Sequence, residues 1–300
     1  MLSPLSNNVI GFGIEIRFPK ETANPSRIFL AMSQLIDSCQ EIQENLILSM
    51  PSLEIEPVLI IEDVRYGSLI TWLTHRMKRD KPSISFDERK AARFLTLGTQ
   101  EIVAFGSNTS DFSDRLLSET QQRILEIAND INPVPDMPIY TSLPKINVLD
   151  SLKKIQDSTL TLAEPEKASL ITSENERISL DFPLDFSREN IEKMLTDRII
   201  ENKVKMILKI KKPDHLGSSQ WEFKGDKLIR AKMSDFKWLD RFKKREFSIF
   251  SGDSIEAYVK ITQRYDADMN EISSSYEVLE VLELHQPDEH NSSIHWSQEE

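Results

Sequence analysis

The residues best suited to chemistry lie in one short stretch of the second half of the chain. Pro213-Asp214 is followed by Glu222-Phe223-Lys224, so two carboxylates and an ammonium group fall within eleven residues. Carboxylate oxygens are ligands that Mg²⁺ prefers, and a neighbouring lysine can stabilise charge on a phosphate. Asp214, Glu222 and Lys224 are therefore candidate catalytic residues for metal-dependent cleavage of nucleic acid, with Asp214 and Glu222 as the metal ligands.

The spacing in this stretch fits such a site less well than the residue types do. In PD…ExK nucleases, the aspartate and the ExK string usually lie on neighbouring antiparallel strands. Here only seven residues separate Asp214 from Glu222, and residues 215–219 have the composition of a loop. The alternative is a turn around Pro213 and Gly217 that leads into a strand. We favour this turn, and with it a protein that is not an enzyme.

Positive charge gathers around the same stretch. The chain carries a net charge of −12, yet residues 201–250 hold 14 Lys and Arg against 7 Asp and Glu, and the remaining residues sum to −19. Aromatic residues are interleaved with these cations, and single-stranded nucleic acid needs both charge for phosphates and flat rings for bases. The candidate binding residues for nucleic acid or an acidic partner are Lys203, Lys205, Lys209, Lys211, Arg230, Lys232, Lys237, Trp238, Arg241 and Lys243.

The same cations and rings also fit an ordinary folded surface. Residues 203–211 alternate lysine with apolar residues, as expected of a strand with one solvated face. Trp221 and Phe223 flank a charged residue, which is typical of positions that face a core. An acidic protein surface, including the acidic first half of this chain, is a third reading. All three readings stay open at the level of the sequence.

Hydrophobic periodicity indicates which elements must position these residues. Period-2 patterns predict strands at 9–18, 57–64, 203–211, 221–223, 228–233, 254–262 and 276–284. Helical spacing predicts helices at 25–48, 86–105, 113–131 and 148–162, with a short helical stretch at 235–244. Residues 69–79 fit a helix and a strand equally well. The mixture predicts an α+β fold.

A run of prolines gives the best candidate for a domain boundary. Four prolines fall between residues 132 and 145, a composition typical of a stiff linker. We therefore expect a helix-rich α+β domain at 1–131 and a Pro-rich linker at 132–147. A C-terminal β-rich domain with a leading helix follows at 148–285, mostly antiparallel and built as a small barrel or sandwich. Residues 286–300 are polar and are predicted to be a disordered tail.

Composition argues against several other classes of site. Cys39 is the single cysteine, and its place in a helical pattern predicts a buried structural thiol. The five histidines lack zinc-finger spacing, and His75 is predicted to be a packing residue. Glycine-rich nucleotide loops are missing, so we expect no metal and no cofactor. The first residues lack a secretion signal and no apolar run could span a membrane, so we expect a cytoplasmic protein without a membrane anchor.

Two stretches carry a resemblance to known proteins. They are EPVLIIEDVRYGSLITWL at 56–73, and LKIKKPDHLGSSQWEFKGDKLIRAKMSDFKWLDRF followed by GDSIEAYV between 208 and 259. Together they resemble a group of bacterial proteins associated with mobile islands and phage-defence loci. The resemblance implies an accessory or sensor role in bacterial immunity, and it implies no role for any particular residue.

Three functions are thus carried forward from the sequence. The first is a non-enzymatic interaction protein, a sensor, regulatory or accessory component of anti-phage defence, which works with a protein partner or by self-association. The second is a nucleic-acid-binding protein that uses the basic, aromatic surface of the C-terminal domain. The third is a Mg²⁺-dependent nuclease at Asp214, Glu222 and Lys224.

Overall fold

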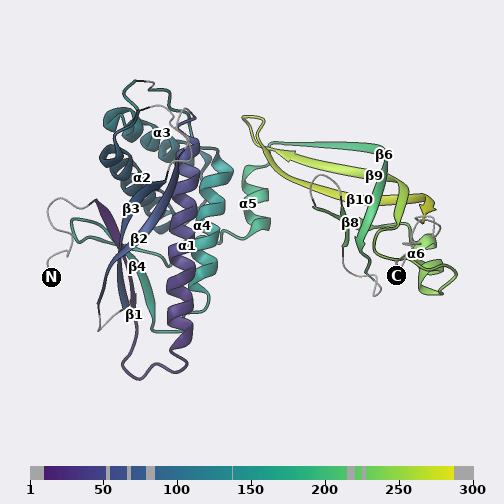
Figure 1. Ribbon diagram of the computed structural model, residues 1–300, viewed down its shortest axis with the longest axis horizontal. Coiled ribbons are helices and arrows are strands. Elements are labelled where there is room, and N and C mark those ends of the chain that lie inside the picture. The colour runs from purple at the N-terminus through teal and green to yellow at the C-terminus, as the bar shows by residue number, and fades with distance from the viewer. Residues whose placement is uncertain are drawn as a thin grey trace, which may run out of the picture. The chain divides into compact units, whose positions relative to one another are not determined.

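The structure contains helices and two β-sheets, which confirms the predicted α+β class (Figure 1). It is a computed structural model that describes residues 10–51, 55–65, 69–78, 85–136, 138–214, 220–224 and 228–286. The chain divides into two compact units, Met1–Leu195 and Thr196–Glu300, called unit 1 and unit 2 below. Among the described residues, no helix has both the length and the apolar character needed to cross a membrane.

Unit 1 is built on a five-stranded sheet in which all neighbouring strands are antiparallel. In order across the sheet the strands are β2 (Glu56–Arg65), β3 (Leu69–Lys78), β1 (Gly11–Arg17), β4 (Lys167–Ile171) and β5 (Arg177–Ser179). The segment at 69–78, whose pattern fits both helix and strand, is a strand because it pairs with β1 on one side and β2 on the other.

Helices cover one face of this sheet (Figure 1). The helices of unit 1 are α1 (Ser26–Leu48), α2 (Glu88–Asn108), α3 (Asp114–Ile131), α4 (Lys145–Thr159) and the short α5 (Arg188–Leu195). Helices α1 and α2 contact the strands, and α5 packs against α4. The apolar side chains of β1, from Phe12 to Ile16, are fully buried in the core. Helices α1 and α2 approach closely at Gly98, where an added Cβ would lie 2.8 Å from a methyl carbon of Leu46.

The proline-rich segment lies inside unit 1 rather than between the two units. Asp87 N–H donates to the carbonyl of Pro133 at 3.0 Å, and Thr141 N–H donates to that of Ser49 at 2.8 Å. Val134 is fully buried. Helix α4 then packs against α1, and β4 pairs with β1, so the chain leaves unit 1 only after Leu195. The boundary thus differs from the predicted linker at 132–147, because prolines stop helices without preventing an extended segment from packing. The predicted tail, apart from Gln286, lies outside the described residues.

Unit 2 is a closed five-stranded barrel. Its strands are β6 (Arg198–Lys212), β7 (Trp221–Lys224), β8 (Leu228–Met233), β9 (Ser254–Tyr265) and β10 (Glu271–His285), and α6 (Phe236–Lys243) lies between β8 and β9 in the chain. The order around the barrel is β10-β8-β7-β6-β9, and only β8 and β10 run parallel. A five-stranded Greek-key barrel with this order has the connectivity of the oligonucleotide/oligosaccharide-binding (OB) fold.

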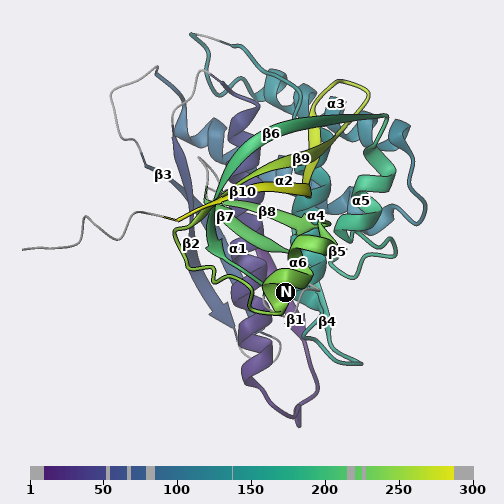
Figure 2. The same ribbon diagram turned by 90° about the vertical axis from the view of Figure 1, so that its right-hand side faces the viewer.

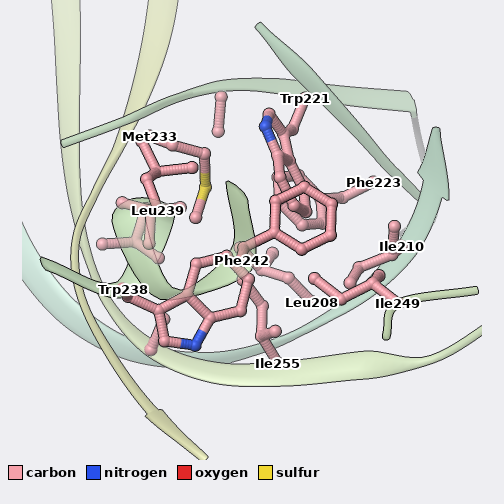
Figure 3. Packing of buried hydrophobic residues seen from close by; sticks show 14 residues of the cluster. Leu208, Ile210, Trp221, Phe223, Met233, Trp238, Leu239, Phe242, Ile249 and Ile255 are labelled. Atoms are coloured by element: carbon pink, nitrogen blue, oxygen red, sulfur yellow. The ribbon is translucent and has the colours of Figure 1, made fainter. Parts of the chain in front are cut away.

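Aromatic side chains from β7 and α6 fill the interior of this barrel (Figure 3). The ring of Trp221 lies 5.7 Å from that of Trp238 and 5.5 Å from that of Phe242, measured between centroids. Helix α6 lies beside β7 and β8 at one end of the barrel (Figure 2). Asp235 fixes it there, since one carboxylate oxygen accepts from Trp238 N–H and the other from Val281 N–H on β10, both at 3.0 Å.

Candidate functional site

The predicted lysines of β6 share the outer face of the barrel. Leu208 and Ile210 point inward and are 2% and 1% exposed. The side chains that alternate with the inward-facing residues are exposed, and they include Lys203, Lys205, Lys209 and Lys211. The period-2 pattern therefore assigned the faces of this strand correctly.

Strands β7 and β8 extend this charged surface. Trp221 and Phe223 are fully buried, so Glu222 and Lys224 lie on the outer face of β7. On β8, Arg230 and Lys232 are exposed on either side of the buried Ala231. The outer faces of β7, of β8 and of β6 from Lys209 to Lys211 thus form one surface, called the basic face below. Its cations are Lys209, Lys211, Lys224, Arg230 and Lys232.

Glu222 is the carboxylate within the basic face, and two cations pair with it. Its side chain lies 3.6 Å from Lys211 Nζ and 3.3 Å from Arg230 Nε. All three groups are at least partly exposed, so solvent screening limits each pair to about 1 kcal/mol or less. Glu222 therefore neutralises part of the charge and leaves the face positive.

Two pairs of lysines lie directly opposite each other in the register of β6 with its neighbours: Lys203 faces Lys260 on β9, and Lys209 faces Lys224 on β7. In the first pair Lys260 lies 3.3 Å from Glu277, so a carboxylate compensates part of the charge. The second pair is Lys209 and Lys224. They are direct partners in the register of β6 and β7, and both are exposed on the outer face. Directly opposite residues in a sheet have Cβ atoms about 5 Å apart, and two like charges in that position destabilise it. Within the described part of the chain, no carboxylate forms an ion pair with either lysine. An anion bound between them would relieve the repulsion.

Lys203 and Lys205 are engaged by the neighbouring strand instead. Lys205 Nζ lies 2.9 Å from Glu256 on β9, and its hydrogen bond to that carboxylate raises the pKa of Lys205. The ammonium group of Lys203 lies 4.5 Å from the ring centroid of Tyr258, a cation–π distance. These two lysines belong to the barrel's own charge pairing, which distinguishes them from Lys209 and Lys224.

The remaining predicted binding residues lie on or near α6. Lys237, Arg241 and Lys243 are exposed, and Arg241 Nε lies 2.9 Å from Glu246. Trp238 is only 8% exposed and stacks on Phe242 in the core. Its ring therefore supports the barrel from inside, as in the core reading of the sequence, and is not presented to a base from outside.

The candidate nuclease residues do not form a free metal site in the described structure. Strands β6 and β7 are antiparallel neighbours, as the motif requires, but Asp214 lies beyond the end of the ladder. Glu222 is paired with Lys211 and Arg230. No three His, Cys, Asp or Glu side chains gather as a metal-binding group in the ranges that the structure describes. Lys224, predicted as catalytic, instead lies in the basic face opposite Lys209.

Comparison with protein-family models, with curated proteins and with solved structures finds no match. The features of unit 2 that bear on function are the strand order of the barrel and the side chains on its outer face. The sequence could locate the cations but not the opposition of Lys209 and Lys224, because that depends on the register between two strands. The sequence signal for this opposition is that both lysines alternate with apolar residues, Lys209 within the predicted strand at 203–211 and Lys224 directly after the next one at 221–223.

Proposed function

We propose that the barrel of unit 2 binds single-stranded nucleic acid across the basic face. The observation that carries this proposal is the direct opposition of Lys209 and Lys224, with which no carboxylate of the described residues forms an ion pair. The strand order adds support, since β7 and β8 are the second and third strands of the barrel, and OB folds bind oligonucleotides on that face. The side chains of the basic face supply the chemistry of binding.

The chemistry of the basic face favours contacts with phosphates over recognition of bases. The rings of Trp221, Phe223, Trp238 and Phe242 are turned into the core, while Phe236 at the start of α6 is exposed. The outward-facing side chains in the described parts of β6, β7 and β8 include no aromatic ring on which a base could stack. Binding should depend steeply on salt and little on sequence. About four phosphate contacts would weaken binding roughly 50-fold between 50 and 200 mM salt, given a slope of about 0.7 per phosphate for single strands.

The decisive experiment compares two double variants that change the net charge equally. We expect K209S/K224S to weaken binding of a fluorescein-labelled oligothymidine by roughly tenfold, which corresponds to about 1.4 kcal/mol. We expect K203S/K205S to have a much smaller effect, since these lysines contact Tyr258 and Glu256. Fluorescence anisotropy at two salt concentrations measures both. Equal losses in the two variants, or no binding by the wild type, would refute the proposal.

The interaction-protein hypothesis and the role in bacterial defence stay predictions. The defence role depends on the resemblance of the stretches at 56–73 and 208–259. An acidic protein surface is chemically compatible with the basic face, but the proposal commits to nucleic acid because of the strand order. We do not propose nuclease activity, because Glu222 is engaged by two cations.

A further inference from the structure

A hollow of about 560 Å³ lies where the end of α6 meets the segment that leads into β9. Its lining residues fall between Phe242 and Phe250, so one short stretch of chain forms it. The volume is in the range of small-molecule sites, which are clefts of about 300–1,000 Å³. The side chains that decide its chemistry are Lys243, Arg245, Phe247 and Phe250.

Arg245 occupies a backbone position that normally favours glycine. Its φ is +60°, and it follows the last turn of α6. Arg245 N–H donates to the carbonyl of Phe242, and Glu246 N–H donates to that of Arg241, which is the hydrogen-bond pattern of a Schellman cap. Glycine is preferred at this left-handed position because a Cβ is strained there. The arginine side chain is thus retained in the lining of the hollow at a cost to the backbone, as is typical of functional positions.

Phe250 adds an exposed ring to the lining of the hollow. It is 66% exposed, yet its backbone is firmly held. Phe250 N–H donates to the buried carboxylate of Asp253 at 2.8 Å, and Gly252 N–H donates to the carbonyl of Ile210 at 2.9 Å. The φ of Gly252 is +107°, which only glycine adopts readily. A large apolar ring on a fixed turn is pre-organised for contact with a ligand.

The charge of the hollow selects an anion. Lys243 and Arg245 are exposed, and no ion pair with a carboxylate of the described residues engages either. The nearest acidic residue in the sequence, Glu246, is held by Arg241 at 2.9 Å. Two cations that form no ion pair among the described residues, in one lining with the exposed ring of Phe250, suit a ligand that joins a phosphate to a flat ring.

We infer that this hollow binds a single nucleotide, with its phosphate on Arg245 and Lys243 and its base against Phe250. This inference does not depend on strand binding by the basic face. The same chemistry could come from a free nucleotide or from the phosphorylated end of a strand, and the test separates the two sources.

The test titrates adenosine 5′-monophosphate into the full chain and follows tryptophan fluorescence. Trp238 is a suitable reporter, because its ring lies 5.2 Å from that of Phe247 in the lining. Adenosine and inorganic phosphate each present half of the ligand. We expect each of them to bind at least tenfold more weakly than adenosine 5′-monophosphate. A 5′-phosphorylated oligothymidine, compared with its unphosphorylated form, tests the end of a strand.

The variant Arg245→Gly separates a role of Arg245 in binding the nucleotide from a purely structural role. We expect it to raise the melting temperature, because the left-handed strain is removed, and to lower nucleotide affinity at least tenfold. Arg245→Ala should lower affinity without raising the melting temperature, and Phe250→Ser should also lower affinity.

Each outcome of this experiment decides the inference. Loss of monophosphate binding in these variants supports a free nucleotide, and a loss seen only with the phosphorylated oligothymidine supports the end of a strand. If neither probe binds, or if the variants bind as the wild type does, the inference is wrong. K209S/K224S should keep nucleotide binding, so failure of the basic face and failure of the hollow are distinguishable.

Discussion

The imidazole of His75 is held between α1 and β1 by two hydrogen bonds. Its Nε2 lies 2.7 Å from the side-chain nitrogen of Gln43, and its Nδ1 lies 3.4 Å from the carbonyl oxygen of Ile10. The edge of the ring also meets Phe12, at 6.2 Å between centroids. The geometry fits a neutral ring that donates from Nδ1 and accepts at Nε2. Burial lowers the pKa of His75 to about 4.

This arrangement predicts a loss of stability between pH 6.5 and 4. In that window the unfolded chain binds a proton that the folded chain rejects, so stability falls as the pH falls. We expect the wild type to lose about 2 kcal/mol of unfolding free energy from this residue between pH 7.5 and 5. In urea unfolding, H75Q should make the unfolding free energy depend less on pH between pH 7.5 and 5. H285Q, at an exposed position on β10, is the control and should keep the wild-type profile. A steep profile in H75Q would contradict the assignment.

Other residues show which local predictions the sequence supports. Cys39 is buried as predicted, and burial raises the pKa of its thiol to about 12. Trp221 and Phe223 are core residues, as their alternation with Glu222 indicated. Trp238 was grouped with the cations around it, but its place on a short helix turns it inward. Helical side chains need several turns of pattern before a face can be assigned, and α6 is only eight residues long.

At the scale of elements, Asp235 connects helix α6 to Val281 on β10, 46 residues later in the chain. One carboxylate oxygen caps α6, and the other accepts the N–H of Val281 on β10. We expect D235A to cost about 2–4 kcal/mol, since a lost cap costs about 1 kcal/mol and an unsatisfied N–H adds about 1–3 kcal/mol. D87A is the matched control, because Asp87 caps α2 alone and should cost only about 1 kcal/mol. Urea unfolding measures both, and equal losses would show that the bond to β10 contributes nothing.

Periodicity predicts the type of an element better than its partner. Most strands and helices begin and end within a few residues of the predicted bounds, since apolar spacing records which face is buried. The placement of β4 and β5 could not be predicted in this way. β4 pairs with β1, which joins residues about 150 positions apart in the chain, and β5 then pairs with β4. The pairing between β1 and β4 leaves no local pattern in the sequence. Residues 69–78 were ambiguous for the same reason, because two neighbouring strands decide their form.

At the scale of the whole molecule, charge is divided between faces of the barrel rather than between domains. Residues 201–250 are strongly basic, yet residues 196–300 hold 17 Lys and Arg against 20 Asp and Glu. Five of the 13 carboxylates that lie in 196–300 outside this basic segment are on β9 and β10. Lys260, for example, lies 3.3 Å from Glu277 across that pair of strands. A local surface can therefore bind a polyanion although the net charge of the chain opposes long-range approach.

The position of the boundary between the units can be tested by cutting the chain. A fragment that begins at residue 196 contains all five barrel strands and α6, and we expect it to unfold cooperatively on its own. A fragment that begins at residue 148, at the boundary predicted from the prolines, keeps most of α4 without the α1 surface that covers it. Val148, Leu152 and Ile155 are fully buried in the whole protein and would face water in that fragment.

The comparison between these two fragments shows whether the boundary between the units is set by the packing of α4 and β4 or by the position of the prolines. Exposed apolar surface of that size promotes aggregation, so we expect the longer fragment to be less soluble although it contains the shorter one. β4 would also lose β1 and present a free edge. Circular dichroism during thermal unfolding, together with size-exclusion chromatography, measures both properties. A soluble, cooperative fragment from residue 148 and an unfolded one from residue 196 would move the boundary back to the prolines. The expected result places it at Leu195, because contacts made by α4 and β4 outweigh the linker-like composition that precedes them.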